Sequence, residues 1–224
     1  SKELVEEWEW SERYPGQPEV LRYLGHVADR FDLRRDIQFE TSVSSARFDV
    51  DQTLWRLETA EGEIFEAPFL IMAVGCLSAA NVPDIPGLGD FQGRWYHTGQ
   101  WPHEGVDFTG LRVGQIGTGS TGIQTAPLIA EQAAHLTVFQ RTANYSIPAR
   151  NHPLSDGFKR YVKENHDEIR RMMHFSPNGH SFLPSDRSAL DSTPEERERV
   201  YEAAWEIGGL RFRTAYRDII ASEA

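Results

Sequence analysis

The chain has 224 residues, of which 39% are apolar and 25% charged, a composition that is ordinary for a globular protein. Its formal net charge of −11 and the lack of a long basic run argue against nucleic acid or an anionic membrane as the main partner. The single cysteine, Cys76, rules out an internal disulfide framework and fits the reducing cytoplasm. No apolar stretch approaches the roughly 20 residues that span a bilayer, so we expect no membrane partner.

The two ends of the chain carry no terminal signal. The sequence opens on SKELVEEWEW without an initiator Met and closes on DIIASEA. The charged and aromatic opening is not a signal peptide. We therefore expect a fragment of a longer protein.

A helix is predicted after Gln17, because Pro18 suits the first turn and apolar residues recur at helical spacing. These residues are Val20, Leu21, Leu24, Val27, Ala28 and Phe31. Short strand-like runs follow and predict a small antiparallel meander with a turn at Gly62. The runs are 37–43, 46–49, 54–60 and 63–67.

The run FLIMAVG (69–75) is continuously apolar, which is typical of a strand buried on both faces of a parallel sheet. Residues 78–110 form a long connection rich in proline and glycine, and such loops are uncommon without a role. Strands are then predicted over 111–117 and 135–141, around a helix at 120–134. Pro127 is expected to bend or break that helix.

Beyond Pro148 the sequence becomes more charged. Amphipathic helices are predicted over 157–173 and 194–207, with the polar run NGHSFLPSD (178–186) between them. We interpret these helices as solvated on one face and packed on a sheet domain with the other.

The stretch VGQIGTGSTGIQ (113–124) contains G-x-G-x-x-G at Gly117, Gly119 and Gly122. The pattern alone is weak, but a strand before it and a helix after it are the context in which it binds a dinucleotide. The first glycine allows the tight turn, the second lets backbone approach phosphate, and the third lets helix and strand pack closely. Free N–H groups at the helix start then face a pyrophosphate. The alternative is an ordinary glycine-rich turn.

The end of the second strand indicates which dinucleotide binds. An NAD site carries an acidic residue there, about 20 residues after the glycines, for the ribose 2′-OH. This strand instead ends VFQR, with Arg141 at its tip. A guanidinium pairs with a 2′-phosphate that a carboxylate would repel, so the sequence favours NADP. The alternative is a solvated arginine at the end of a strand.

A second motif precedes the glycine turn, in FQGRWYHTGQWP (91–102). Its defined positions are Phe91, Gly93, His97, Trp101 and Pro102. Together they resemble the fingerprint F-x-G-x-x-x-H-x-x-x-W-P of the Baeyer–Villiger monooxygenases. The surrounding stretches ERYPGQPEVLRYLGHVADRFDLR, FLIMAVGCLS and VFQRTANYSIPARN are also similar to this family, mostly to its phenylacetone monooxygenase branch. Phe91 and Trp101 are alternatively core aromatics that hold this segment.

The resemblance implies an α/β flavoprotein with two Rossmann-like dinucleotide-binding domains, one for FAD and one for NADP. It implies that residues 1–75 are the C-terminal part of an FAD-binding segment and that 76–110 are a linker. Residues 111–224 would then be the NADP-binding domain, with a helical insertion from about residue 151. The family's FAD glycine turn and catalytic arginine would lie outside this chain, so no catalytic residue is assigned.

The resemblance also implies roles for individual residues. Arg141 and Thr142 would bind the 2′-phosphate of NADP, and the backbone of Val43 would meet the adenine of FAD. His97 would shape a linker that moves between cofactor arrangements; the alternative is a structural, hydrogen-bonding histidine. The residues that would line the pyrophosphate are Thr118, Gly119, Ser120, Thr121, Gly122, Ile123 and Gln124.

The implied activity is an FAD- and NADPH-dependent conversion of a ketone and O2 to an ester or lactone. One alternative is a flavin-dependent N- or S-hydroxylating monooxygenase, against which Trp101 and Pro102 argue because that group closes its fingerprint differently. Another is a non-catalytic NADP-binding module. No His/Cys/Asp/Glu cluster has metal-ligand spacing, so no metal is expected.

Overall fold

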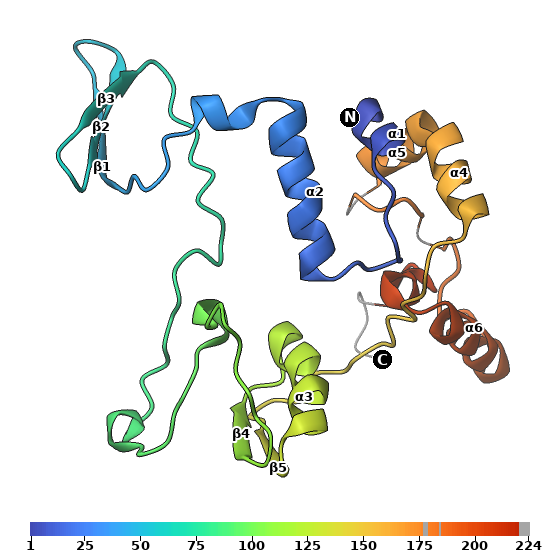
Figure 1. Cartoon of the computed structure of the whole chain (residues 1–224). Coiled ribbons are helices and arrows are strands. Elements are labelled where there is room, and N and C mark those ends of the chain that lie inside the picture. The colour runs from blue at the N-terminus through green and yellow to red at the C-terminus, as the bar shows by residue number, and fades with distance from the viewer. Residues whose placement is uncertain (177–178, 184, 220–224) are drawn as a thin grey trace. The chain divides into compact units, whose positions relative to one another are not determined.

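The computed structural model describes residues 1–176, 179–183 and 185–219 (Figure 1). Its contacts divide the chain into two compact units. One unit joins Ser1–Glu40 to Ser146–Ala224, and the other is Thr41–Tyr145. The domain boundaries that the resemblance implies stay predictions.

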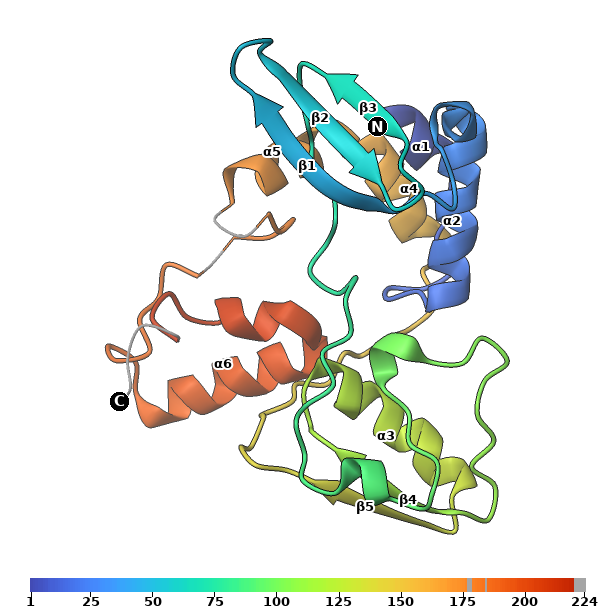
Figure 2. The same ribbon diagram turned by 90° about the vertical axis from the view of Figure 1, so that its left-hand side faces the viewer.

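The unit Thr41–Tyr145 contains a parallel strand–helix–strand motif (Figure 2). Its elements are β4 Arg112–Ile116, α3 Ser120–Gln132 and β5 His135–Phe139. The two strands pair in parallel, from Arg112 opposite His135 to Ile116 opposite Phe139, and α3 packs against both. The predicted order of strand, helix and strand is therefore confirmed.

Helix α3 continues through Pro127 as one helix, so the predicted break does not occur. The proline removes the N–H that would bond to the carbonyl of Ile123. Packing of α3 on the strands, where Ile129 is 9% exposed, stabilises the helix around this missing bond.

The same unit contains the predicted antiparallel meander, in the order β1-β2-β3. Its strands are β1 Val43–Asp49, β2 Leu54–Thr59 and β3 Ile64–Ala67. The prediction of separate strands at 37–43 and 46–49 was wrong, because one strand covers 43–49 and residues 37–42 are irregular. Glu40 has a φ of +54°, in the left-handed region, which an extended strand does not contain.

The strand predicted at 69–75 is absent, and this prediction was wrong. Phe69 is 83% exposed and Ile71 is 89% exposed. A strand buried on both faces needs hydrogen-bonded neighbours at its edges, and no strand in the described part of the chain pairs with this run. The following connection is also irregular, apart from single 3-10 turns at Leu88–Asp90 and Thr98–Gln100.

The other unit is helical in its regular structure. Its helices are α1 Lys2–Glu7, α2 Gln17–Arg30, α4 Asp156–Glu164, α5 His166–Phe175 and α6 Pro194–Ile207, with 3-10 turns at Leu33–Asp36 and Gly209–Thr214. The predictions of α2 and α6 are confirmed. Helix α6 begins with a capping box between Thr193 and Glu196, so its start is encoded locally.

The single helix predicted over 157–173 is wrong, because α4 and α5 divide at Asn165. The backbone N–H of Asn165 donates to the carbonyl of Tyr161 over 3.0 Å, and its Nδ2 donates to the same oxygen over 2.8 Å. This short side chain competes with the regular helical pattern. The predicted polar run 178–186 lies partly outside the described residues.

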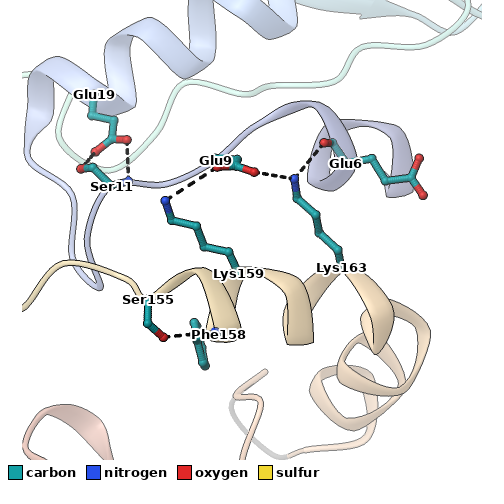
Figure 3. Close-up of polar contacts among 8 residues, drawn as sticks. All are labelled: Glu6, Glu9, Ser11, Glu19, Ser155, Phe158, Lys159 and Lys163. Atoms are coloured by element: carbon teal, nitrogen blue, oxygen red, sulfur yellow. Dashed lines mark hydrogen bonds and ion pairs between the residues drawn. The ribbon is translucent and has the colours of Figure 1, made fainter.

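Ion pairs from Glu9 to Lys159 and Lys163 join the two segments of this unit (Figure 3). The carboxylate of Glu9 lies 3.0 Å from Nζ of Lys163 and 3.7 Å from Nζ of Lys159. Glu19 in α2 accepts hydrogen bonds from the hydroxyl of Ser11 over 2.5 Å and from its N–H over 2.9 Å. Exposed ion pairs stabilise little. Within the second segment, the ring of Tyr216 is 1% exposed and packs on Tyr201 of α6 with 5.4 Å between the ring centroids, and this burial stabilises more.

Candidate functional site

The glycine turn connects β4 to α3 with a backbone that its first glycine makes possible. Gly117 has a φ of +100°, in the region that favours glycine. Its N–H donates to the carbonyl of Phe139 over 2.9 Å, so pairing with β5 continues one residue past β4. Gly119 then caps α3 with an extended backbone and no side-chain hydrogen bond at the cap.

Gly122 is required by the close approach of the helix to the turn. A Cβ atom added to Gly122 would lie 2.5 Å from the carbonyl oxygen of Gly117. Real Cβ contacts are not that short, and both partners belong to the backbone. The roles that the sequence pattern suggested for the first and third glycines therefore have a geometric basis in this chain.

The start of α3 leaves backbone donors available. Among the described residues, the N–H groups from Thr118 to Gly122 have no hydrogen-bond acceptor. The N–H of Ile123, by contrast, already donates to the carbonyl of Gly119 over 3.0 Å. The side chain of Gln124 turns back on Ser120, with Nε2 donating to its carbonyl over 2.8 Å. The donors open to an anion are therefore those of 118–122, at the positive end of the helix dipole.

The segment after β5 supplies the predicted 2′-phosphate residues. Arg141 and Thr142 are exposed, and Arg141 forms no ion pair with any residue that the structure describes. Asn144 lies three positions further on, and its Nδ2 donates to the carbonyl of Thr118 over 3.2 Å and lies 3.4 Å from Thr118 Oγ1. This contact, which the sequence reasoning missed, brings the arginine-bearing segment to the glycine turn. A polar residue just past the strand end was the signal for it.

The fingerprint residues hold the local shape of the connection. The Phe91 ring packs on Gly93, where an added Cβ would lie 2.6 Å from the ring. His97 Nδ1 accepts the N–H of Gly99 over 3.1 Å and caps the short turn Thr98–Gln100. An imidazole that accepts at Nδ1 carries no proton there.

The end of the fingerprint joins an aromatic row. The Trp101 ring centroid lies 5.9 Å from that of Tyr96 and 6.0 Å from that of Phe108, which is buried. The carbonyl of Pro102 accepts the N–H of Gly105 over 3.0 Å and forms a tight turn. The row ends one short loop before β4, so the fingerprint packs onto the segment that leads into the glycine turn.

The predicted flavin residue, Val43, does not share a sheet with these elements. It begins β1 opposite Thr59 and is 53% exposed, whereas the glycine turn adjoins the β4–β5 pair. The structure thus brings together the glycine turn, Asn144 and the segment of Arg141, and it holds Val43 in the meander.

The described ranges contain neither a metal-binding cluster nor a membrane-spanning helix. There, no group of three or more His, Cys, Asp or Glu side chains is placed to hold a metal ion. The helices of the same ranges are too short or too polar for any of them to cross a membrane.

A known family model matches most of the chain. Residues 1–178 match the family described as pyridine nucleotide-disulphide oxidoreductase. The chain belongs to this family. The chain is 47% identical over 208 residues to a Baeyer–Villiger monooxygenase from Pseudooceanicola batsensis, an alignment that covers 93% of this chain and 38% of that protein. It is 44% identical over 212 residues to a phenazine N-monooxygenase from Lysobacter antibioticus, covering 94% of this chain and 39% of the relative.

Solved structures are also similar to this chain. A steroid monooxygenase bound to NADP matches with a TM-score of 0.90 and 54% identity over 97% of this chain and 42% of the other. A complex named OTEMO with FAD and NADP matches with a TM-score of 0.93 and 36% identity over 99% of this chain and 43% of the other. The predicted α/β flavoprotein fold and the resemblance to Baeyer–Villiger monooxygenases are confirmed. The chain spans about two fifths of the length of the curated relatives it matches.

Proposed function

We propose that the protein containing this chain is an FAD- and NADPH-dependent Baeyer–Villiger monooxygenase. It inserts one oxygen atom of O2 next to a ketone carbonyl and produces an ester or lactone. The observation that carries this proposal is the complete fingerprint from Phe91 to Pro102, followed by the glycine turn. The similarity to a Baeyer–Villiger monooxygenase over 93% of the chain supports it.

The NADP site in this proposal is the glycine turn with the segment after β5. The free N–H groups of 118–122 bind the pyrophosphate, because they need acceptors and lie at the positive end of α3. Gly117, Ile123 and Gln124 complete the turn around it. Arg141, which has no carboxylate partner in the described residues, binds the 2′-phosphate together with Thr142.

The remaining residues are assigned to the flavin and the linker. When bound, NADPH supplies a hydride and FAD supplies the oxygen chemistry, while the protein orients both. Residues 1–75 belong to the FAD-binding segment, where the backbone of Val43 meets the adenine. Residues 76–110 form the linker, which His97 shapes through its hydrogen bond to Gly99. Residues 111–224 form the NADP-binding domain with its helical insertion from about residue 151.

The test is a turnover assay with the purified full-length protein. A yellow flavin absorbance is expected, together with NADPH oxidation that accelerates when an aryl or cyclic ketone is added. Mass spectrometry should find the product heavier than the ketone by one oxygen atom, taken from labelled O2. Colourless protein that still binds NADPH would instead favour a non-catalytic NADP-binding module.

A second candidate is flavin-dependent N-oxidation. The close of the fingerprint at Trp101 and Pro102 argues against it, but a relative named phenazine N-monooxygenase is 44% identical over 94% of this chain. The same assay separates the two activities. NADPH oxidation that responds to an aromatic N-heterocycle and not to ketones, with an N-oxide as product, would favour this candidate.

The partners and the cellular location proposed for the enzyme rest on the sequence. Its proposed partners are a small ketone and O2, as the proposed reaction requires. Nucleic acid is not among them, because a net charge of −11 would repel the phosphate backbone. We propose a cytoplasmic location, because a single cysteine fits a reducing compartment.

A further inference from the structure

A glutamine one residue before the end of β4 reaches into the glycine turn. Nε2 of Gln115 donates to the carbonyl oxygen of Gly117 and to that of Gly122, each over 3.0 Å. The side chain is partly buried, so these bonds form where water competes less. One amide nitrogen therefore joins the turn to the first turn of α3.

The two carbonyls determine which way the Gln115 amide faces. If its oxygen and nitrogen were exchanged, Oε1 would face two carbonyl oxygens, which is repulsive. In the orientation observed, Oε1 lies 3.2 Å from Oγ1 of Thr125.

Thr125 supplies the hydrogen that Oε1 accepts. Its hydroxyl is also 3.1 Å from the carbonyl of Thr121 and 3.2 Å from that of Gly122, but it has one hydrogen to donate. Those two carbonyls already face the helical N–H groups of residues 125 and 126. Gln115 Oε1 is thus the acceptor without another donor among the described residues.

The hydrogen bond from Gln115 to the Gly117 carbonyl also determines the direction of the next backbone N–H, that of Thr118. In a trans peptide the N–H of residue 118 points opposite to the C=O of Gly117. Because Gln115 holds that oxygen on its own side, the N–H of Thr118 points away from Gln115 and stays free. The carbonyl oxygens of Gly117 and Gly122, which would repel a phosphate, instead face the side-chain amide of Gln115.

We propose that Gln115 is a positioning residue for the pyrophosphate of NADP and that Thr125 orients its amide. This inference rests on the proposed function. Gln115 does not touch the cofactor; it preorganises the backbone donors that do, so its loss weakens the binding of ligands that carry the pyrophosphate. Ligands that bind only through the adenosine 2′-phosphate keep their affinity.

The first test is Gln115→Met in the full-length protein, titrated calorimetrically with NADP+ and with adenosine 2′-monophosphate, which lacks the pyrophosphate. Methionine is similarly long and unbranched but forms neither bond. We expect the Kd for NADP+ to rise about tenfold, as the loss of hydrogen bonds worth about 1–2 kcal/mol implies, and the Kd for the monophosphate to change less than about twofold. A structural defect would instead weaken both ligands equally, which would overturn the inference.

The second test is a double-mutant cycle with Thr125→Val. This change removes the hydroxyl and keeps the shape, so NADP+ affinity should fall about two- to threefold. Because Thr125 acts through Gln115, the double variant should bind NADP+ as the Gln115→Met variant does. Additive effects would overturn the orienting role.

The control is Gln52→Met, in the turn between β1 and β2, which should change neither Kd.

If Gln115→Met fails to fold, the Thr125→Val variant tests the proposal instead. Unchanged NADP+ affinity in that variant overturns the proposal, and a selective loss supports it. If the unmutated protein binds both the monophosphate and NADP+ and every variant has the same two affinities, this inference is wrong and the proposed function stands. An unmutated protein that binds neither ligand defeats the proposed function, and this inference with it.

Discussion

The side-chain amide of Asn144 donates to the backbone carbonyl of Thr118 over 3.2 Å. This one bond spans 26 residues of sequence and joins the segment after β5 to the first loop of the glycine turn. Arg141 lies three residues before Asn144, so the bond limits where its guanidinium can reach. We therefore expect the proposed 2′-phosphate and pyrophosphate contacts to be coupled.

We predict that Asn144→Ala lowers the preference for NADPH over NADH about fivefold. Losing one hydrogen bond of about 1 kcal/mol frees the segment that carries Arg141, whereas the contacts common to both dinucleotides remain. The measurement is the ratio of kcat/KM for the two reductants. Asn144→Asp, which loses the donor and adds a negative charge, should lower the ratio further. An unchanged ratio in both variants would contradict the prediction.

For Arg141→Ala we predict a selective loss of NADPH use, by about 10- to 100-fold in kcat/KM. Charge-assisted hydrogen bonds to the 2′-phosphate are worth about 1.5–3 kcal/mol, and NADH makes none of them. Arg112→Ala is the matched control, since that arginine is also exposed but begins β4, at the end opposite the turn. Equal efficiencies of NADPH and NADH in the unmutated protein would refute the assignment.

Gly122→Ala should reduce both stability and NADP+ binding. The added Cβ would meet the carbonyl of Gly117 at 2.5 Å, and overpacking of this kind costs about 1–3 kcal/mol. At Gly119, nothing lies within 4 Å of an added Cβ and φ is −70°, so Gly119→Ala should retain stability while it obstructs the phosphate. Thermal unfolding and NADP+ titration of the two variants check this contrast. Equal unfolding midpoints for both would contradict it.

Glu19 is predicted to make stability depend on pH. The hydroxyl of Ser11, followed by its N–H, holds the pKa of Glu19 below its ordinary value. A lowered pKa in the folded state means that the stabilisation is complete above the unfolded value, about 4.3, and is lost as pH falls through the folded pKa. The difference in unfolding temperature between the wild type and Glu19→Gln should therefore shrink as pH falls below about 4.3. A difference that stays constant from about pH 7 to pH 3 would count against it.

Local signals predicted the elements that need few distant partners. Helix α6 matches its prediction because Thr193 and Glu196 close a capping box within the first turn. The motif from β4 to β5 was predictable because Gly117 and Gly122 act through conformational freedom and missing volume, both of which the residue type implies. Hydrophobic periodicity then identified the elements on either side of the turn.

Predictions that depended on neighbours were less successful. The run 69–75 has the composition of a buried strand, but a strand exists only where others hydrogen-bond to it. The division of α4 from α5 depended on Asn165 bonding back to Tyr161, which apolar spacing does not register. The continuity of α3 through Pro127 depended on packing against β4 and β5.

By itself, the sequence determined that this chain contains a dinucleotide-type turn with an arginine after it and a fingerprint before it. Those features are properties of residue type and spacing, which are read along the chain. Only the tertiary structure decided that Gln115 would hold two carbonyls of the turn and that Asn144 would reach Thr118. The physical reason is that a side-chain hydrogen bond acts over about 3 Å, and folding alone determines which residues come that close.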